Sequence, residues 1–182
     1  MKPLLLLSLM TLLLAGCQAS VMLRSDDSSA YRVNAVRLLQ PLTVYPDTTR
    51  TFVQDGEVLA KGGQGDQYRA RCAFELRALS SSYRTIEPAN FEVSRVQHVI
   101  DEVVLSKPLQ LAGLNLTAID GGGGAPLVHA GYHFWFEAEP AGVMRMSCYG
   151  VFEVIQQVEP PTLEDIRRTL AGVAEISVTR SP

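Results

Sequence analysis

The sequence has no excess of positive charge. Its 182 residues include 16 lysines and arginines and 19 aspartates and glutamates, which gives a formal net charge of −3 at pH 7. Such a balance provides no electrostatic attraction to nucleic acid or to anionic lipid. We therefore expect no nucleic-acid partner, and any attachment to a membrane must come from something other than charge.

The sequence also has no apolar run long enough to span a bilayer. Its most apolar stretch, residues 4–14, is about half as long as the roughly 20 residues that a spanning helix needs. The stretch follows Lys2 and precedes the small residues Ala15 and Gly16. A short cationic start, an apolar core and small residues before a cleavage point are typical of a secretory signal.

The end of this signal, Leu14-Ala15-Gly16-Cys17, resembles the lipobox of bacterial lipoproteins. The resemblance implies cleavage before Cys17, lipidation of its sulfur and acylation of the new amino terminus, so that acyl chains hold the protein on a membrane. Gln18 stands where retained inner-membrane lipoproteins usually carry aspartate. This implies the outer membrane of a Gram-negative cell, facing the periplasm. The alternative is a plain secretory signal cleaved after Ala19, although Cys17 fits its small-x-small pattern poorly.

Cysteine is scarce. The chain has three cysteines, and once Cys17 carries lipid only Cys72 and Cys148 remain. The periplasm oxidises thiols, so an even remainder in that compartment predicts a disulfide between them. Two buried free thiols are the alternative.

Common signatures of catalysis are missing as well. The sequence contains no Gly-x-Ser-x-Gly nucleophile motif. The run Gly121, Gly122, Gly123, Gly124 is followed by Pro126 and a predicted strand, whereas a phosphate-binding loop needs a helix behind it and usually a lysine. We therefore predict a protein that is not an enzyme and needs no cofactor.

His129 and His133 have the spacing of metal ligands on a helix. The surrounding residues 127–136 predict a strand instead, which places the two side chains roughly 13 Å apart. Nitrogen ligands lie about 2 Å from a metal ion, so the two histidines cannot share one unless a bulge at Gly131 brings them together. We predict exposed or hydrogen-bonded histidines and no metal site.

Alternating apolar and polar residues predict strands along most of the chain. Asp55-Gly56, between two short apolar segments, is typical of a tight β-hairpin. Only the end of the chain predicts a helix, with Thr162 as its cap, Asp165 at the third position and an apolar stripe behind them. The predicted fold is mainly β, an antiparallel β-sandwich or small barrel with one short C-terminal helix.

Three segments need a more specific assignment of secondary structure or of strand faces. Residues 96–105 fit either a strand or a short helix, and residues 109–119 predict a strand in which Gly113 forms a bulge. For the long strand at residues 143–158, strict alternation predicts one face with Met144, Met146, Cys148, Phe152 and Val154, opposite Arg145, Ser147 and Glu153.

The chain divides into three predicted parts. Residues 1–16 form the signal peptide, residues 17–30 the lipidated Cys17 and a flexible tether, and residues 31–182 a single β-rich domain large enough for its own core. Leu23 and its neighbours in the tether either lie at the membrane interface or dock on the domain, and the sequence leaves both open.

Aromatic residues are few, and several of them lie between residues 132 and 152. Alternation places Trp135 and His133 on the strand face opposite Tyr132, Phe134 and Phe136. An exposed Trp135 marks a candidate contact patch, whereas a strand covered on both faces makes it core. The loop of Gly121, Gly122, Gly123 and Gly124 is a second candidate contact point, because loops at sheet ends commonly carry recognition.

Three segments resemble a recurring block in uncharacterised proteobacterial envelope proteins: Thr51-Phe52-Val53-Gln54-Asp55-Gly56, Asp66-Gln67-Tyr68 and Cys72-Ala73-Phe74-Glu75-Leu76. The resemblance implies a bacterial envelope protein and transfers no functional residue.

We therefore predict a lipid-anchored, disulfide-bonded envelope protein with a binding or structural role and an envelope protein as its partner. One alternative is a periplasmic domain that binds a small ligand in an apolar cavity between its sheets. The other is an enzyme, which would need His98, His129 or His133 beside a carboxylate.

Overall fold

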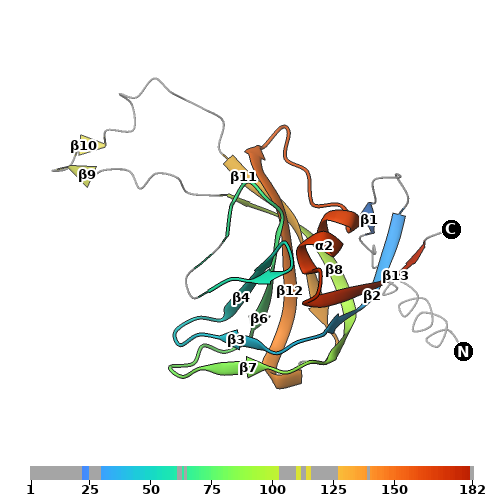
Figure 1. Cartoon of the computed structure of the whole chain (residues 1–182). Helices are drawn as coiled ribbons and strands as arrows, with labels where there is room; N and C mark the ends of the chain where they lie inside the picture. The colour runs from blue at the N-terminus through green and yellow to red at the C-terminus, as the bar shows by residue number, and fades with distance from the viewer. Residues whose placement is uncertain are drawn as a thin grey trace, which may run out of the picture.

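A curled antiparallel sheet forms most of the protein (Figure 1). The structure is a computed structural model, and it describes residues 22–24, 30–60, 63, 65–102, 110–111, 114–115, 127–138 and 140–180. The sheet curls into a half-barrel accompanied by one α-helix, which confirms the predicted fold class. The elements are β1 (Leu23–Arg24), β2 (Ala30–Leu38), β3 (Leu42–Val44), β4 (Arg50–Gln54), β5 (Glu57–Val58), β6 (Arg71–Leu76), β7 (Arg84–Ile86), β8 (Asn90–Glu102), β9 (Gln110–Leu111), β10 (Leu114–Asn115), β11 (Leu127–Phe136), the 3-10 turn η2 (Pro140–Gly142), β12 (Val143–Val154), α2 (Leu163–Leu170) and β13 (Ala174–Arg180).

The main sheet runs in the order β13-β2-β8-β11-β12-β6-β4-β5, and β1 also pairs with β2. β13 covers one edge of β2 over residues 31–38, whereas β8 pairs with the other edge only at residues 35–37. Beyond that point β8 diverges from β2, and β1 pairs with residues 30–31 of β2 instead. β1 therefore occupies the place beside β2 that β8 leaves.

One face of β6, β11 and β12 carries the apolar core, as alternation predicts. Its fully buried side chains include Phe74, Phe134 and Met146. Cys72 of β6 and Cys148 of β12 are register partners within this core and form a disulfide, which confirms the predicted pair.

The helix α2 bridges the two ends of the curled sheet, because it contacts β13 at one end and β4 and β6 near the other (Figure 1). It begins at the predicted cap, where the Thr162 hydroxyl accepts from the Asp165 N–H and the Asp165 carboxylate accepts from the Thr162 N–H. Its apolar stripe of Leu163, Ile166 and Leu170 is fully buried. No helix in the described part of the chain has the length and apolar character that crossing a membrane requires.

The predicted hairpin at Asp55-Gly56 is confirmed and joins β4 to β5. Both turn residues have positive φ, 53° and 80°, as a type I′ turn requires. A Cβ atom at Gly56 would lie 2.6 Å from the carbonyl oxygen of Ala171, so the turn also packs too closely against the end of α2 for any side chain.

A bulge in β12 corrects the predicted position of Phe152. The pairing of β12 with β11 shifts by one residue between Tyr149 and Phe152, so Phe152 faces His129 instead of sharing the core face with Cys148. Gly150 lies within the bulge, where a Cβ atom would be 2.7 Å from the carbonyl oxygen of Glu159. The prediction was wrong because it assumed an uninterrupted period of two.

Two further local assignments are corrected. The register of β12 with β6 shifts between Val143 and Arg145, so Val143 and not Met144 occupies the core position. Val143 is fully buried. β8 continues as a strand to Glu102, so the helix alternative there is wrong. β9 and β10 pair with each other, and the predicted bulge at Gly113 lies outside the described residues. β1 and β7 were not predicted, because two or three residues are too short for a periodic signal.

Candidate functional site

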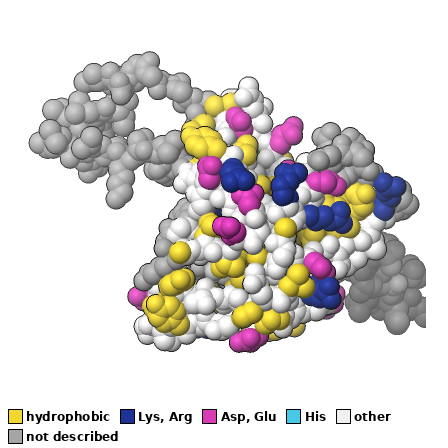
Figure 2. Space-filling view, viewed as in Figure 1, with side chains coloured by type: hydrophobic (Ala, Val, Ile, Leu, Met, Phe, Trp, Pro, Cys, Tyr) yellow, Lys and Arg dark blue, Asp and Glu magenta, His cyan; other side chains and the backbone are white. Residues whose placement is uncertain are grey.

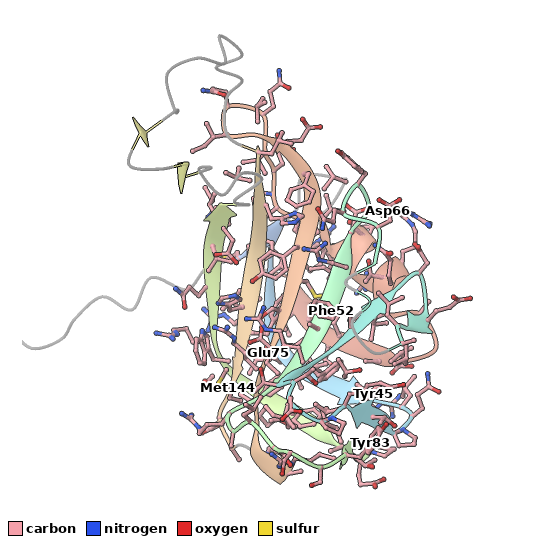
Figure 3. All side chains as sticks on the ribbon, turned by 90° about the vertical axis from the view of Figure 1, so that its left-hand side faces the viewer. Tyr45, Phe52, Asp66, Glu75, Tyr83 and Met144 are labelled. Carbon is pink, nitrogen blue, oxygen red and sulfur yellow. A yellow bond between two sulfur atoms is a disulfide. The ribbon has the colours of Figure 1, made fainter. Side chains whose placement is uncertain are left out.

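The sheet face opposite the core is rich in polar side chains, and we call it the polar face. It consists of alternate residues of β4, β6, β12, β11 and β8. Phe52 of β4 and Glu75 of β6 are labelled near the middle of Figure 3, and the register of these two strands pairs Arg50 with Glu75. Several of its polar members are almost fully buried: Arg71, Glu75, His129, His133 and Ser147. Burying such groups is costly unless each finds a partner, so their contacts decide what this face can do.

Glu75 lies at the centre of the polar face and is 2% exposed. Its carboxylate accepts hydrogen bonds from Arg145 Nη2 at 2.9 Å and from the Ser147 hydroxyl, and it pairs with Arg50 Nε at 3.2 Å. Burial alone would raise the pKa of Glu75, but the hydrogen bonds from Arg145 and Ser147 and the charge of Arg50 outweigh it, so this pKa lies below its usual value. Glu75 is therefore ionised and fixes two arginines.

His133 connects this centre to Asp101 through a directed chain of hydrogen bonds. Arg145 Nη1 lies 3.0 Å from His133 Nδ1, and because arginine can only donate, the proton of the neutral imidazole is on Nε2. The Nε2–H donates to the Tyr149 hydroxyl at 3.0 Å, and that hydroxyl donates to Asp101 at 2.9 Å.

The surroundings keep both middle members of this chain neutral. Burial, and then the charge of Arg145, lower the pKa of His133. Burial, and then the hydrogen bond to Asp101, raise the pKa of Tyr149. Each donor and acceptor in the chain therefore has one role at neutral pH.

Gly131 makes room for this arrangement. A Cβ atom at Gly131 would lie 2.3 Å from the Cys148 carbonyl oxygen and 2.7 Å from the ring of Tyr149. The tyrosine ring thus lies over the glycine on the neighbouring strand. Any larger residue at Gly131 would push the Tyr149 hydroxyl away from its two partners.

Arg71 and His129 form a second pair at the other end of the polar face. Arg71 Nη2 donates to His129 Nε2 at 2.9 Å, which places the imidazole proton on Nδ1. The His129 ring stacks on Phe152 with centroids 3.5 Å apart, a contact that the bulge in β12 creates. Burial, and then the charge of Arg71, lower the pKa of His129 to about 4.

The neutral state of His129 makes stability depend on pH. In the unfolded chain a histidine titrates near pH 6.5, whereas in the folded protein His129 stays neutral down to about pH 4. The unfolded state therefore binds more protons in this range, and the free energy of unfolding decreases as the pH falls from 6.5 to 4. We expect His129 to account for at most about 3 kcal/mol of this loss, measured by urea denaturation at a series of pH values.

The variant His129→Gln isolates this contribution, because glutamine offers Arg71 an acceptor but does not titrate. Its free energy of unfolding should vary less with pH between 6.5 and 4 than that of the wild type. His98→Gln, which changes an exposed histidine, is the matched control variant. Identical pH dependence in His129→Gln and the wild type would contradict the assignment.

Trp135 lies partly exposed on the polar face, opposite Phe134 as predicted. Its ring lies between two guanidinium groups, with Arg95 at 5.0 Å and Arg145 at 4.8 Å from the ring centroid. The indole N–H donates to Gln97 at 3.1 Å. We call these four residues, Arg95, Gln97, Trp135 and Arg145, the Trp135 patch. Tryptophan and arginine dominate the binding energy of many protein interfaces, so the patch has the composition of a contact site.

The two histidines of β11 are buried and hydrogen-bonded. A register shift lies between His129 and Gly131, where a bulge would be needed for the two histidines to share a metal ion. The two Nε2 atoms nevertheless have different partners, Arg71 for His129 and Tyr149 for His133. Across the described ranges, no group of three or more His, Cys, Asp or Glu side chains could hold a metal ion.

Direct contact between a histidine and a carboxylate is not seen within the described residues. His133 reaches Asp101 only through Tyr149 and reaches Glu75 only through Arg145. The polar face therefore provides donors and fixed charges, and it lacks a histidine that a carboxylate orients as a general base.

Among the cavities that open at the surface of the described residues, two bear on the small-ligand alternative. The larger, about 410 Å³, lies at the edge of β4, and its lining includes Tyr45, Arg50 and Leu79. Tyr45 also contacts the exposed Tyr83, with centroids 5.4 Å apart, and apolar side chains gather at the lower left of Figure 2. The smaller, about 380 Å³, lies beside the start of α2. Both have mixed polar and apolar linings, unlike the apolar cavity of the small-ligand alternative.

The predicted site residues fall into three groups. Cys72 and Cys148 lie in the core, and Trp135 lies on the polar face. Cys17 and the run Gly121, Gly122, Gly123, Gly124 lie outside the described residues. Arg71 and Glu75 were not predicted as site residues, because nothing near them in the sequence indicates their burial.

The chain was also compared with known proteins. Neither protein-family models, nor curated proteins, nor solved structures gave a match. Function must therefore be inferred from the residues and the geometry alone.

Proposed function

We propose that this chain is a lipid-anchored protein of the bacterial cell envelope that acts by binding a partner and not by catalysis. Acyl chains on Cys17 hold it on the outer membrane of a Gram-negative cell, facing the periplasm. Its partner is another envelope protein, which it contacts through the Trp135 patch.

The geometry of Trp135 is the observation that carries the binding role. The indole is partly exposed and is held between two cations and by a hydrogen bond to Gln97. Arg145 is itself fixed by Glu75 and His133. A side chain that is already ordered loses little conformational entropy on binding, so more of the contact energy remains as affinity.

Two features support the envelope location. The Cys72–Cys148 disulfide suits an oxidising compartment. Only five residues, 18–22, separate Cys17 from Leu23 at the start of β1, which allows a reach of at most about 20 Å. Such a short connection keeps Leu23, and the domain that it belongs to, near the membrane and raises the effective concentration of the domain toward partners on the same surface.

Site-specific crosslinking in intact cells tests the contact. A photo-crosslinking amino acid at Glu137, an exposed position two residues after Trp135, should capture an envelope protein. Trp135→Ala should reduce this capture about tenfold or more, because truncation of an aromatic residue at the centre of an interface commonly costs at least 2 kcal/mol. Thermal unfolding shows whether the variant remains folded.

The matched control is Tyr83→Ala, which removes an exposed aromatic side chain outside the polar face and should leave capture unchanged. A crosslinker at the exposed Glu57 of β5 should capture less than one at Glu137. Undiminished capture by a folded Trp135→Ala variant would show that the patch is wrong. Turnover of a substrate by the purified protein would reject a purely binding role.

A further inference from the structure

Arg71 is a buried cation that lacks a counter-charge among the described residues. Arg71 is 8% exposed, and within the described ranges its side chain hydrogen-bonds only to the neutral ring of His129. Burial, and then the positive charge of Arg50, lower the pKa of Arg71, while Tyr149 acts in the opposite direction.

A guanidinium in this position cannot become neutral. Histidine or lysine loses its proton when burial becomes too costly, but arginine stays protonated at any pH that a folded protein tolerates. A buried charge without a partner is strongly unfavourable. The position is thus stable only if an anion reaches it or if its cost is tolerated for a function.

The unsatisfied atoms of the polar face are all donors. In the part of the chain that the structure describes, three buried arginine nitrogens lack a hydrogen-bond partner: Arg71 Nε, Arg71 Nη1 and Arg145 Nε. The two Arg71 nitrogens alone carry three N–H groups. A buried water could accept from some of them, but it would bring no negative charge. The group that satisfies both requirements is an oxyanion.

His129 fixes the direction of the guanidinium without neutralising it. Its Nε2 accepts from Arg71 Nη2, and its ring is held against Phe152. A carboxylate in the place of His129 would complete an ion pair and leave Arg71 with no need for a ligand. A neutral acceptor instead orients Arg71 and preserves its charge for another partner.

We propose that Arg71 binds an oxyanion, a carboxylate or phosphate group, through Nε and Nη1, and that His129 is its positioning residue. The inference adds a ligand class to the proposed binding function and rests on that function only for the source of the anion. Arg71 suits such a group because a planar guanidinium matches the geometry of carboxylate and phosphate oxygens.

Thermal unfolding of the full-length protein in neutral detergent tests this site. Sodium phosphate or sodium acetate replaces sodium chloride at constant ionic strength and pH 7. At least one of the two anions should raise Tm, by about 5 °C when its concentration is about 100 times Kd. The anion that acts at lower concentration identifies the group that the site prefers. Because the readout needs no partner and no lipidation, its outcome is independent of the crosslinking result.

Arg71→Met should abolish the response to both anions while folding as well as the wild type or better, since it removes a buried unpaired charge. Arg95→Met is the matched control, because it removes an exposed arginine of the same face and should keep the response. If Arg71→Met does not fold, Arg71→Lys decides, with Kd expected to rise about tenfold because the planar fork is lost. Absence of a response in the wild type, an equal response in a folded Arg71 variant, or a crystal grown in phosphate with only water at Arg71 would each overturn the proposal.

Discussion

Replacing Cys17 with serine is expected to abolish lipidation of the protein completely. The motif Leu14-Ala15-Gly16-Cys17 supplies a single sulfur for the thioether bond, and an alcohol at that position cannot replace it. Two or more acyl chains hold a protein stably on a bilayer, whereas a protein without them has only its surface charge, which is not attractive here. Labelling with radioactive palmitate in a Gram-negative host measures the effect as presence or absence of label.

The control for this experiment is the double variant Cys72→Ser, Cys148→Ser. It removes the other two cysteines and should still incorporate label, because neither of them belongs to the motif that ends at Cys17. A wild-type protein that takes up no palmitate in a host that processes lipoproteins would reject the anchor, and with it the proposed location.

Loss of the Cys72–Cys148 disulfide should cause the largest change in stability. The two cysteines are 76 positions apart, so the bridge closes a long loop in the unfolded chain. The chain-entropy treatment gives roughly 4.5 kcal/mol for such a loop, and measured values often fall short of it. For a protein of this size the expected decrease in Tm is about 10 °C. The double variant Cys72→Ala, Cys148→Ala measures it by thermal unfolding.

Reduction of the wild-type protein with dithiothreitol should lower Tm by a similar amount and should have no effect on the double variant. Two alkylatable thiols in protein prepared from the periplasm without reductant would show that the bridge does not form in the cell.

Local sequence patterns predicted the features that depend on neighbouring residues. The hairpin at Asp55-Gly56 and the cap at Thr162 involve contacts within a few positions, and both are present. Alternation placed Trp135 opposite Phe134 because the spacing of two holds along β11. These predictions succeeded because backbone geometry alone decides them.

The polar face could not be predicted in the same way. Glu75 and Arg71 alternate with the core residues Cys72 and Phe74, which is the pattern of a strand with one solvent-exposed face. Both side chains are nevertheless buried. The main partner of Glu75, Arg145, lies 70 positions away, and the partner of Arg71, His129, lies 58 positions away. Pairing of the three strands β6, β12 and β11 brings them together, and a single sequence contains no local trace of it.

The bulge in β12 was not predicted, for a related reason. Its extra residue is accommodated where Gly150 packs against the backbone of Glu159, and this contact forms only after the chain has turned back on itself. Phe152 moves to the polar face as a result and supports the ring of His129. A one-residue insertion in a strand thus determines the surroundings of Arg71.

The position of β1 makes residues 23–24 part of the folded domain and not part of a flexible linker. Leu23 is fully buried in β1, which pairs with residues 30–31 of β2 where β8 no longer pairs with that strand. A chain shortened to begin at Tyr31 would lose this buried side chain, with a loss of about 1.5–3 kcal/mol of burial energy. The distance between anchor and domain can therefore be lengthened without damage only by inserting residues ahead of Met22.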